Sequence, residues 1–61
     1  MWEKLREKLK KQGYICTHNC CWSKNVVIVH VEWKNVKYYK VIKNRHEYVA
    51  HSEEEVEWLI S

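Results

Sequence analysis

The stretch from Asn25 to Lys43 most constrains what this chain can fold into, because it predicts two strands that reverse at Lys34-Asn35. Its first half is rich in β-branched residues, which favour strands. A two-residue turn sets apolar residues opposite apolar residues and one glutamate opposite a lysine, as cross-strand pairing prefers. The predicted pairs are Trp33 with Val36, Glu32 with Lys37, Val31 with Tyr38, His30 with Tyr39, Val29 with Lys40, Ile28 with Val41, Val27 with Ile42, and Val26 with Lys43. The one exception is Lys40, a charged residue placed opposite the apolar Val29.

Amphipathic helices are predicted at both ends of the chain. In residues 2–12, one apolar stripe consists of Trp2, Leu5 and Leu9, and Gly13 follows as a left-handed residue that ends the helix. Near the other end, a serine followed three residues later by a glutamate forms a capping box, which predicts a second helix from about residue 53. The capping pair is Ser52 with Glu55, and the buried stripe of this helix is Val56, Leu59 and Ile60.

The remaining segments predict short strands. Residues 14–17 are expected to leave the first helix as a strand, and residues 18–24 to form a loop or a distorted strand because they show no clean period. Asn44-Arg45 predicts a second turn before a strand at 46–50. The order is helix, three- or four-stranded antiparallel meander, helix. We therefore expect one two-layer α+β domain, residues 1–61, with both helices on one face of the sheet.

The sheet has apolar side chains on both faces, and two short helices can cover only one of them. The more apolar face is expected to be the covered one; its residues are Val27, Val29, Val31, Trp33, Val36, Tyr38 and Ile42. The opposite face is then the candidate interface for a second copy or another protein, with residues Val26, Ile28, His30, Tyr39 and Val41. A chain of 61 residues buries only about 60% of its extended-chain surface, so dimerisation would add stability.

The charge is unevenly distributed along the sequence. The formal net charge is +3, and four of the eight acidic residues lie between positions 53 and 57, so the rest of the chain is clearly basic. Basic residues interleaved with aromatic ones suit single-stranded nucleic acid, where bases stack on rings. The candidate nucleic-acid-binding residues are Lys24, Lys37, Tyr39, Lys43 and Arg45. The alternative is an ordinary solvated lysine surface.

The order of elements resembles that of the double-stranded RNA-binding fold. The resemblance is topological and covers no motif. The second predicted helix begins Ser52-Glu53-Glu54-Glu55, and these carboxylates would repel the phosphates that such a fold binds. No function is therefore carried over from that family.

Three cysteines and four histidines raise the question of a metal site. Cys16, Cys20, His46 and His51 superficially resemble a classical zinc finger, but their 25-residue spacer is about twice as long as in that motif. In an extended strand the two cysteines lie about 13 Å apart, too far to share a metal or a disulfide. We expect no cofactor, with these four residues as the zinc candidates, and we expect the cysteines to be thiols.

The chemistry of enzymes is poorly represented. There is no Asp, the single Gly cannot form a phosphate-binding loop, and no serine lies in a nucleophile elbow. We expect neither a catalytic residue nor a small-molecule substrate. The charged N-terminal segment and the absence of a long apolar run predict a soluble intracellular protein without a membrane partner.

Three hypotheses about function follow. The first is a small binding module, for example from a virus, whose basic surface contacts nucleic acid. The second is a homodimeric or protein–protein interaction module that uses the free face of the sheet. The third is a designed α+β scaffold without a biological role, suggested by the regular first helix and the scarcity of Gly and Pro.

Overall fold

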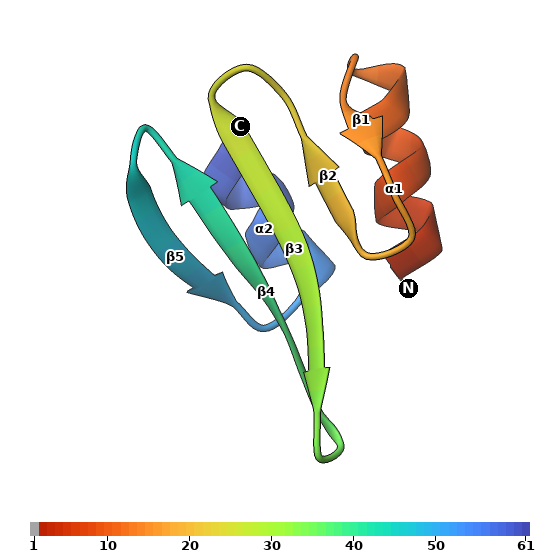
Figure 1. Cartoon of the computed structure of the whole chain (residues 1–61), viewed down its shortest axis with the longest axis vertical. Coiled ribbons are helices and arrows are strands. Elements are labelled where there is room, and N and C mark those ends of the chain that lie inside the picture. Colours follow the sequence, from red (N-terminus) through yellow and green to blue (C-terminus); the bar gives the residue numbers. More distant parts are fainter. Residues whose placement is uncertain (1) are drawn as a thin grey trace.

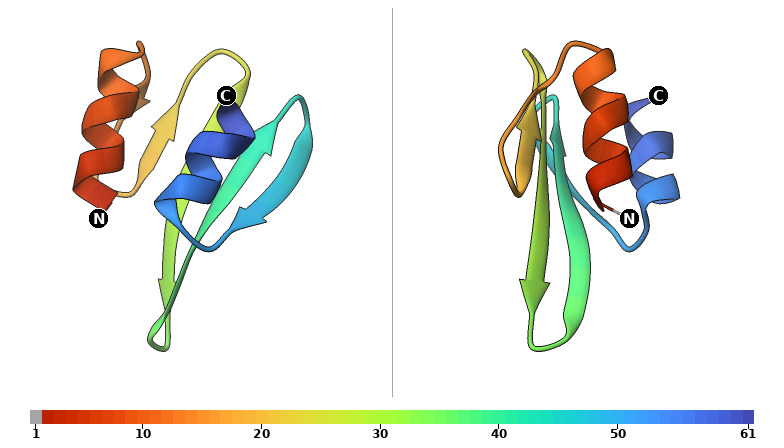
Figure 2. Two further views of the ribbon diagram at one scale, coloured as in Figure 1. Left: turned by 180° about the vertical axis from the view of Figure 1, so that it is seen from behind. Right: turned by 90° about the vertical axis from the view of Figure 1, so that its right-hand side faces the viewer.

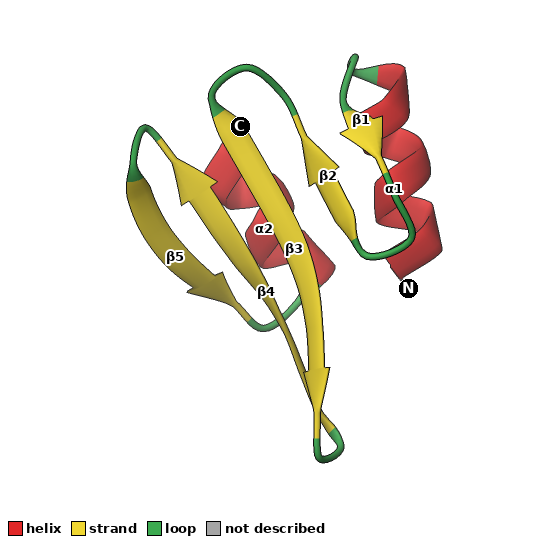
Figure 3. Ribbon diagram, in the orientation of Figure 1, coloured by secondary structure: helices red, strands yellow, loops and turns green. Residues whose placement is uncertain are grey.

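The computed structural model describes residues 2–61 and shows two helices packed against one side of a five-stranded antiparallel sheet (Figure 1). The strands lie side by side in chain order (Figure 3). In chain order the elements are α1 (Trp2–Lys11), β1 (Ile15–Cys16), β2 (Cys20–Trp22), β3 (Val26–Trp33), β4 (Val36–Lys43), β5 (His46–Ala50) and α2 (Glu53–Ile60). The predicted α+β meander is confirmed, with one strand beyond the three or four expected, because β2 forms in the segment predicted to be a loop or a distorted strand.

The long β3–β4 hairpin has the predicted register at all eight pairs, from Trp33 with Val36 to Val26 with Lys43. Its turn residues Lys34 and Asn35 have φ angles of 47° and 68°, and the next turn, at Asn44 and Arg45, has 52° and 69°. Left-handed conformations at both central residues match the right-handed twist of the flanking strands. Both turns are therefore two residues long, and β5 begins where the sequence predicted.

Helix α1 ends as its sequence predicts. Gly13 has a φ of 97°, and the backbone N–H groups of Gly13 and Tyr14 donate to the carbonyls of Lys10 and Leu9, each at 3.0 Å. This is the Schellman arrangement, in which a left-handed glycine lets the last helical carbonyls find donors.

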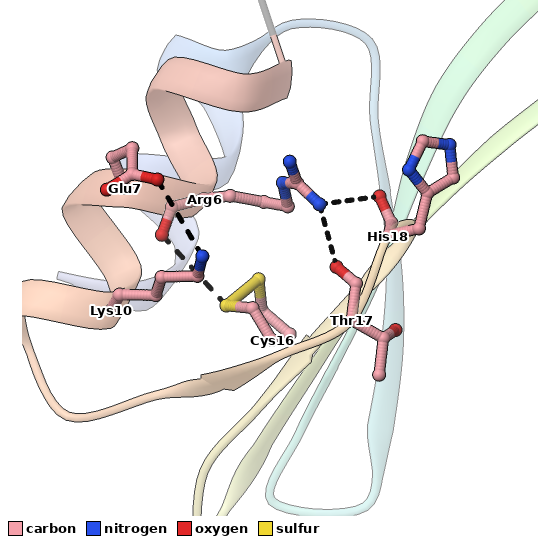
Figure 4. Close-up of polar contacts among 7 residues, drawn as sticks. Arg6, Glu7, Lys10, Cys16, Thr17 and His18 are labelled. Carbon is pink, nitrogen blue, oxygen red and sulfur yellow. Dashed lines mark hydrogen bonds and ion pairs between the residues drawn. A yellow bond between two sulfur atoms is a disulfide. The ribbon is translucent and has the colours of Figure 1, made fainter.

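Side chains of α1 also fasten the helix to the β1–β2 hairpin. The indole Nε1 of Trp2 donates to the carbonyl of His18 at 2.8 Å. Arg6 donates through Nη1 to the carbonyls of Thr17 and His18 at 3.0 and 3.2 Å (Figure 4). These bonds add to those within the turn, where the backbone N–H of Thr17 donates to the carbonyl of Cys20 at 2.7 Å.

Helix α2 is capped by Ser52, whose Oγ accepts a hydrogen bond from the backbone N–H of Glu55 at 3.1 Å. The Glu55 carboxylate accepts one from the backbone N–H of His51, also at 3.1 Å. At the other end, Lys43 Nζ donates to the carbonyl of Leu59 at 3.0 Å. The capping pair is confirmed, and the sheet supplies the cation that the helix lacks in its last turn.

The core lies between the sheet and the two helices, which share one side of it (Figure 2). The helices contribute Trp2, Leu5, Leu9 and Val56, and the sheet contributes Cys21, Ile28, Tyr39, Val41 and Ala50. Ile28 and Val41 are fully buried. Since both were expected on the free face, the predicted choice of covered face is wrong.

Lys40 gives the physical reason for the opposite choice. It lies near the middle of β4, on the same face as its partner Val29 and as Val27 and Val31. A helix laid over that face would have to bury an ammonium group, which is costly without a partner. On the covered face the charged groups of β3 and β4 lie toward the strand ends, and Ile28 and Val41 are fully buried between them.

Cys16 and Cys21 form a disulfide across β1 and β2, where they are direct partners with Cα atoms 4.0 Å apart. The expectation of three thiols is therefore wrong. Antiparallel partners in a non-hydrogen-bonded pair come close enough to be bridged. The separation of about 13 Å applies to one extended strand, whereas the chain turns back between Cys16 and Cys21. Cys20 remains a free thiol.

Candidate protein interface

One whole face of the sheet carries no helix, and we call it the open face. Its members follow from the strand register, because direct cross-strand partners point to the same side. They form four rows across the sheet: Ile15, Trp22, Val27, Ile42 and Glu47; Cys20, Val29, Lys40 and Val49; Val31 and Tyr38; Trp33 and Val36. Eleven of these thirteen side chains are apolar. An antiparallel sheet with one face in water normally alternates apolar and polar residues, and this one does not.

The exposure of the open face is greatest at its margins. Trp33 is 67% exposed and Val36 is 56% exposed at the far end of the β3–β4 hairpin, which extends beyond the helices (Figure 1). Ile15 is 62% exposed and Val49 is 51% exposed on the two edge strands. The central valines are half-buried by their neighbours in the sheet. Apolar surface therefore continues from one edge strand to the other.

The two charged members of the open face have opposite signs. Lys40 pairs with Val49, and Glu47 pairs with Ile42, so the two charges are diagonal neighbours on β4 and β5. Diagonal side chains are within reach of one another when at least one is long. The open face is thus nearly neutral, although the chain as a whole carries a formal net charge of +3.

The structure places the predicted interface residues in the opposite layer. Ile28 and Val41 form the centre of the core, and Tyr39 is 8% exposed. Val26 packs against the same cluster, and the rings of His30, Trp2 and Tyr39 lie against one another. Ile28, Tyr39 and Val41 are therefore buried beneath the helices, whereas Val26 and His30 keep part of their surface exposed. The prediction that one sheet face is left bare stands, but the face is the other one.

The predicted nucleic-acid-binding residues do not share a surface. Lys24 and Arg45 lie beside the same shallow hollow at one end of the sheet, whereas Lys37 lies near the far turn, more than about 20 Å along the strands. Tyr39 is buried and offers no ring on which a base could stack. Lys43 is engaged with the last turn of α2. The fold therefore separates the five candidate nucleic-acid-binding residues.

The predicted zinc ligands are also separated. Cys16 is bound in the disulfide, and Cys20 points to the open face because it pairs with Val29. His46 and His51 lie at opposite ends of β5 and border different hollows. Within residues 2–61, no three His, Cys, Asp or Glu side chains come close enough to hold a metal ion.

The covered side has a polar cleft of about 620 Å³ beside the start of α1. The rings of His30, Trp2 and Tyr39 line it, with centroids 5.2 to 5.6 Å apart. Burial raises the pKa of the Tyr39 hydroxyl above its usual 10.0, and the carboxylates of Glu53 and Glu3 add to the effect. The hydroxyl therefore stays protonated at neutral pH, and we find no group positioned to use it as an acid.

None of the open-face residues was an interface candidate, and seven of the thirteen were expected in the core because their face was counted as the more apolar one. One feature of the sequence indicates which face of the sheet the helices cover. Lys40 interrupts the otherwise apolar set, whereas the set containing Ile28 and Val41 has no charge at its centre. A single central charge outweighs several extra apolar side chains, because an unpaired buried charge costs more than a buried valine gains.

Comparison of the chain with family models, curated proteins and solved structures finds no match. None of the helices in the described part of the chain is long and apolar enough to cross a membrane. The open face is accordingly interpreted from its own chemistry.

Proposed function

We propose that this chain is a non-enzymatic protein–protein interaction module that binds through the open face of its sheet. The observation that supports this proposal is the composition of that face, with eleven apolar side chains among thirteen, on the side away from both helices. Extended apolar patches of this kind mark interaction sites in small globular proteins.

The energetic basis is the removal of apolar surface from water. Full burial of a valine, isoleucine or similar side chain contributes about 1.5–3 kcal/mol relative to full exposure. The rim supplies the large anchors: Trp33 and Ile15 are more than half exposed at opposite margins. Tryptophan is among the residues that dominate measured binding energies at interfaces. A partner that covers the face from Ile15 to Trp33 gains from the margins as well as from the centre.

Photo-crosslinking tests the proposal. A photoreactive benzoylphenylalanine replaces Tyr38 on the open face in the synthetic 61-residue chain. A matched chain carries it at Tyr48, which is 41% exposed on the other side of the sheet. Each chain is irradiated in an extract of its source cells, and adducts are resolved by mass.

The expected result is a polypeptide adduct at position 38, of any mass, with little or none at position 48. The proposal fails if position 38 yields no polypeptide adduct, yields only lipid adducts, or yields the same adducts as position 48.

A further inference from the structure

We propose that the occupant of the open face is a second copy of this chain, packed sheet against sheet about a two-fold axis. This inference rests on the proposed function and specifies its partner. The resulting dimer has four layers, with the helices outside and the two sheets inside. Aligned packing of twisted sheets at a separation of about 10 Å is a common arrangement for such layers.

The exposed area supports a missing second layer. A monomer of 7.6 kDa normally exposes about 4,300 Å². This chain exposes 4751 Å², so its excess is about 450 Å². The five strands offer a similar area, since each strand residue covers about 3.3 Å by 4.8 Å and the sheet in projection measures about 400 Å². Two copies face to face bury about 800–900 Å², the size of a weak or transient interface.

The charges on the open face make it complementary to itself. A two-fold axis gives the same contact twice, so residue i of one copy meets residue j of the other and the reverse also holds. Lys40 and Glu47 have opposite signs, so the face is nearly neutral. A partner of strongly acidic or basic character would place a like charge against one of them, whereas a second copy carries no such excess of either sign.

The core of the single chain is small, so dimerisation would add to its stability. Only nine residues of the described chain form the buried cluster, and none of them is charged. Domains of this size commonly gain stability from oligomerisation or from covalent links. The Cys16–Cys21 disulfide closes only a short loop at one edge of the sheet, so most of the sheet gains nothing from it.

Sedimentation equilibrium between about 1 μM and 1 mM tests the inference, since an interface of this size favours a dissociation constant in the micromolar range. The wild-type chain is compared with Val31→Lys on the open face and with Glu32→Gln, the adjacent residue on the other face. Both substitutions change the net charge by +1, and position 32 is exposed. Circular dichroism confirms that each variant is folded.

We expect a mass twice that of the 7.6 kDa chain for the wild type and for Glu32→Gln. For Val31→Lys we expect the dissociation constant of the dimer to increase by about tenfold or more, because an ammonium group is placed inside the apolar contact. A monomeric wild type at 1 mM overturns the inference. A dimer that tolerates Val31→Lys overturns it as well, because the contact then lies elsewhere.

The two proposals fail in different ways. A monomeric wild type whose position 38 still crosslinks to another polypeptide removes the dimer and leaves the interaction module. A monomeric wild type without any polypeptide adduct removes both.

Discussion

Val29 and Val41 carry the same side chain on adjacent strands, yet they experience opposite environments. Val41 pairs with Ile28 beneath the helices and is fully buried, whereas Val29 pairs with Lys40 on the open face and is half-buried. The same substitution at both positions therefore measures what each layer contributes to stability, with side-chain volume and strand propensity held constant.

Val41→Ala is expected to lower the free energy of unfolding by about 2–3 kcal/mol, because it removes two buried methyl groups and leaves a cavity. Val29→Ala is expected to cost less than about 1 kcal/mol at low protein concentration, where the open face is in water. Urea denaturation at about 1 μM makes the comparison. Equal costs at the two positions would contradict the assignment of the covered face.

Tyr39 carries a pH dependence that follows from its burial. Its pKa is raised above 10.0, first by burial and then by Glu53 and Glu3. Above the unfolded-state pKa, the unfolded chain has lost this proton while the folded chain retains it, so unfolding is favoured. The stabilising contribution is complete below about pH 10 and declines as the pH rises through the folded-state value.

We expect Tyr39→Phe to reduce the loss of stability between pH 9 and pH 11, measured by urea denaturation at each pH. Tyr38→Phe on the open face is the matched control and should keep the alkaline loss. An unchanged alkaline loss in Tyr39→Phe would show that other groups cause it.

At the scale of elements, the features that depend on neighbouring residues were predictable. The stripe of α1, its glycine terminus, the capping pair of α2 and both two-residue turns follow from local propensities and a few hydrogen bonds. The β3–β4 register followed because a one-residue slip would have moved every side chain to the other face. Each of these was confirmed by the structure.

The features that were mispredicted depend on distant parts of the chain. The strand β2 is three residues long and has no period of its own; its pairing with β3 makes it a strand. The disulfide depends on that same pairing. The covered face was chosen by counting apolar side chains, which ignored the cost of burying Lys40, and the candidate interface moved with that choice.

The cap of α2 gives a prediction at this scale. Ser52→Ala removes the acceptor for the Glu55 N–H and should cost about 1 kcal/mol in the free energy of unfolding. Ser61→Ala, the same substitution at the opposite end of the helix, removes only an exposed hydrogen bond to Trp58 and should cost less than about 0.5 kcal/mol. Chemical denaturation of both variants decides between them, and a larger effect at position 61 would contradict the capping role.

The hairpin of β1 and β2 gives a second prediction at the scale of elements. The disulfide joins residues five apart, and closing so short a loop is worth about 2 kcal/mol in the chain-entropy view. Reduction should lower the free energy of unfolding by about that amount and leave the amide exchange protection of β3 and β4 in place. Cys20→Ser, which keeps the bridge, should lose as much on reduction as the wild type does. Loss of protection in β4 on reduction would mean that the bridge holds the whole sheet.

For the whole molecule, the proposed dimer makes thermal stability depend on concentration. Association removes folded monomer from the unfolding equilibrium, so the apparent stability increases with protein concentration. Between about 1 μM and 1 mM we expect the thermal midpoint of the wild type to rise by about 5–10 °C. The midpoint of Val31→Lys should rise by a smaller amount over the same range. Scanning calorimetry over this range measures both, and a constant wild-type midpoint would count against association.

The start of α1 and the C-terminus lie in the helical layer, on the side away from the open face (Figure 2). A tether, a fluorescent label or a fused cargo at either end would therefore leave from the back of the sheet and would not obstruct its front. When two such sheets pack against each other, the attached cargoes would lie on opposite outer sides of the dimer, separated by both sheets.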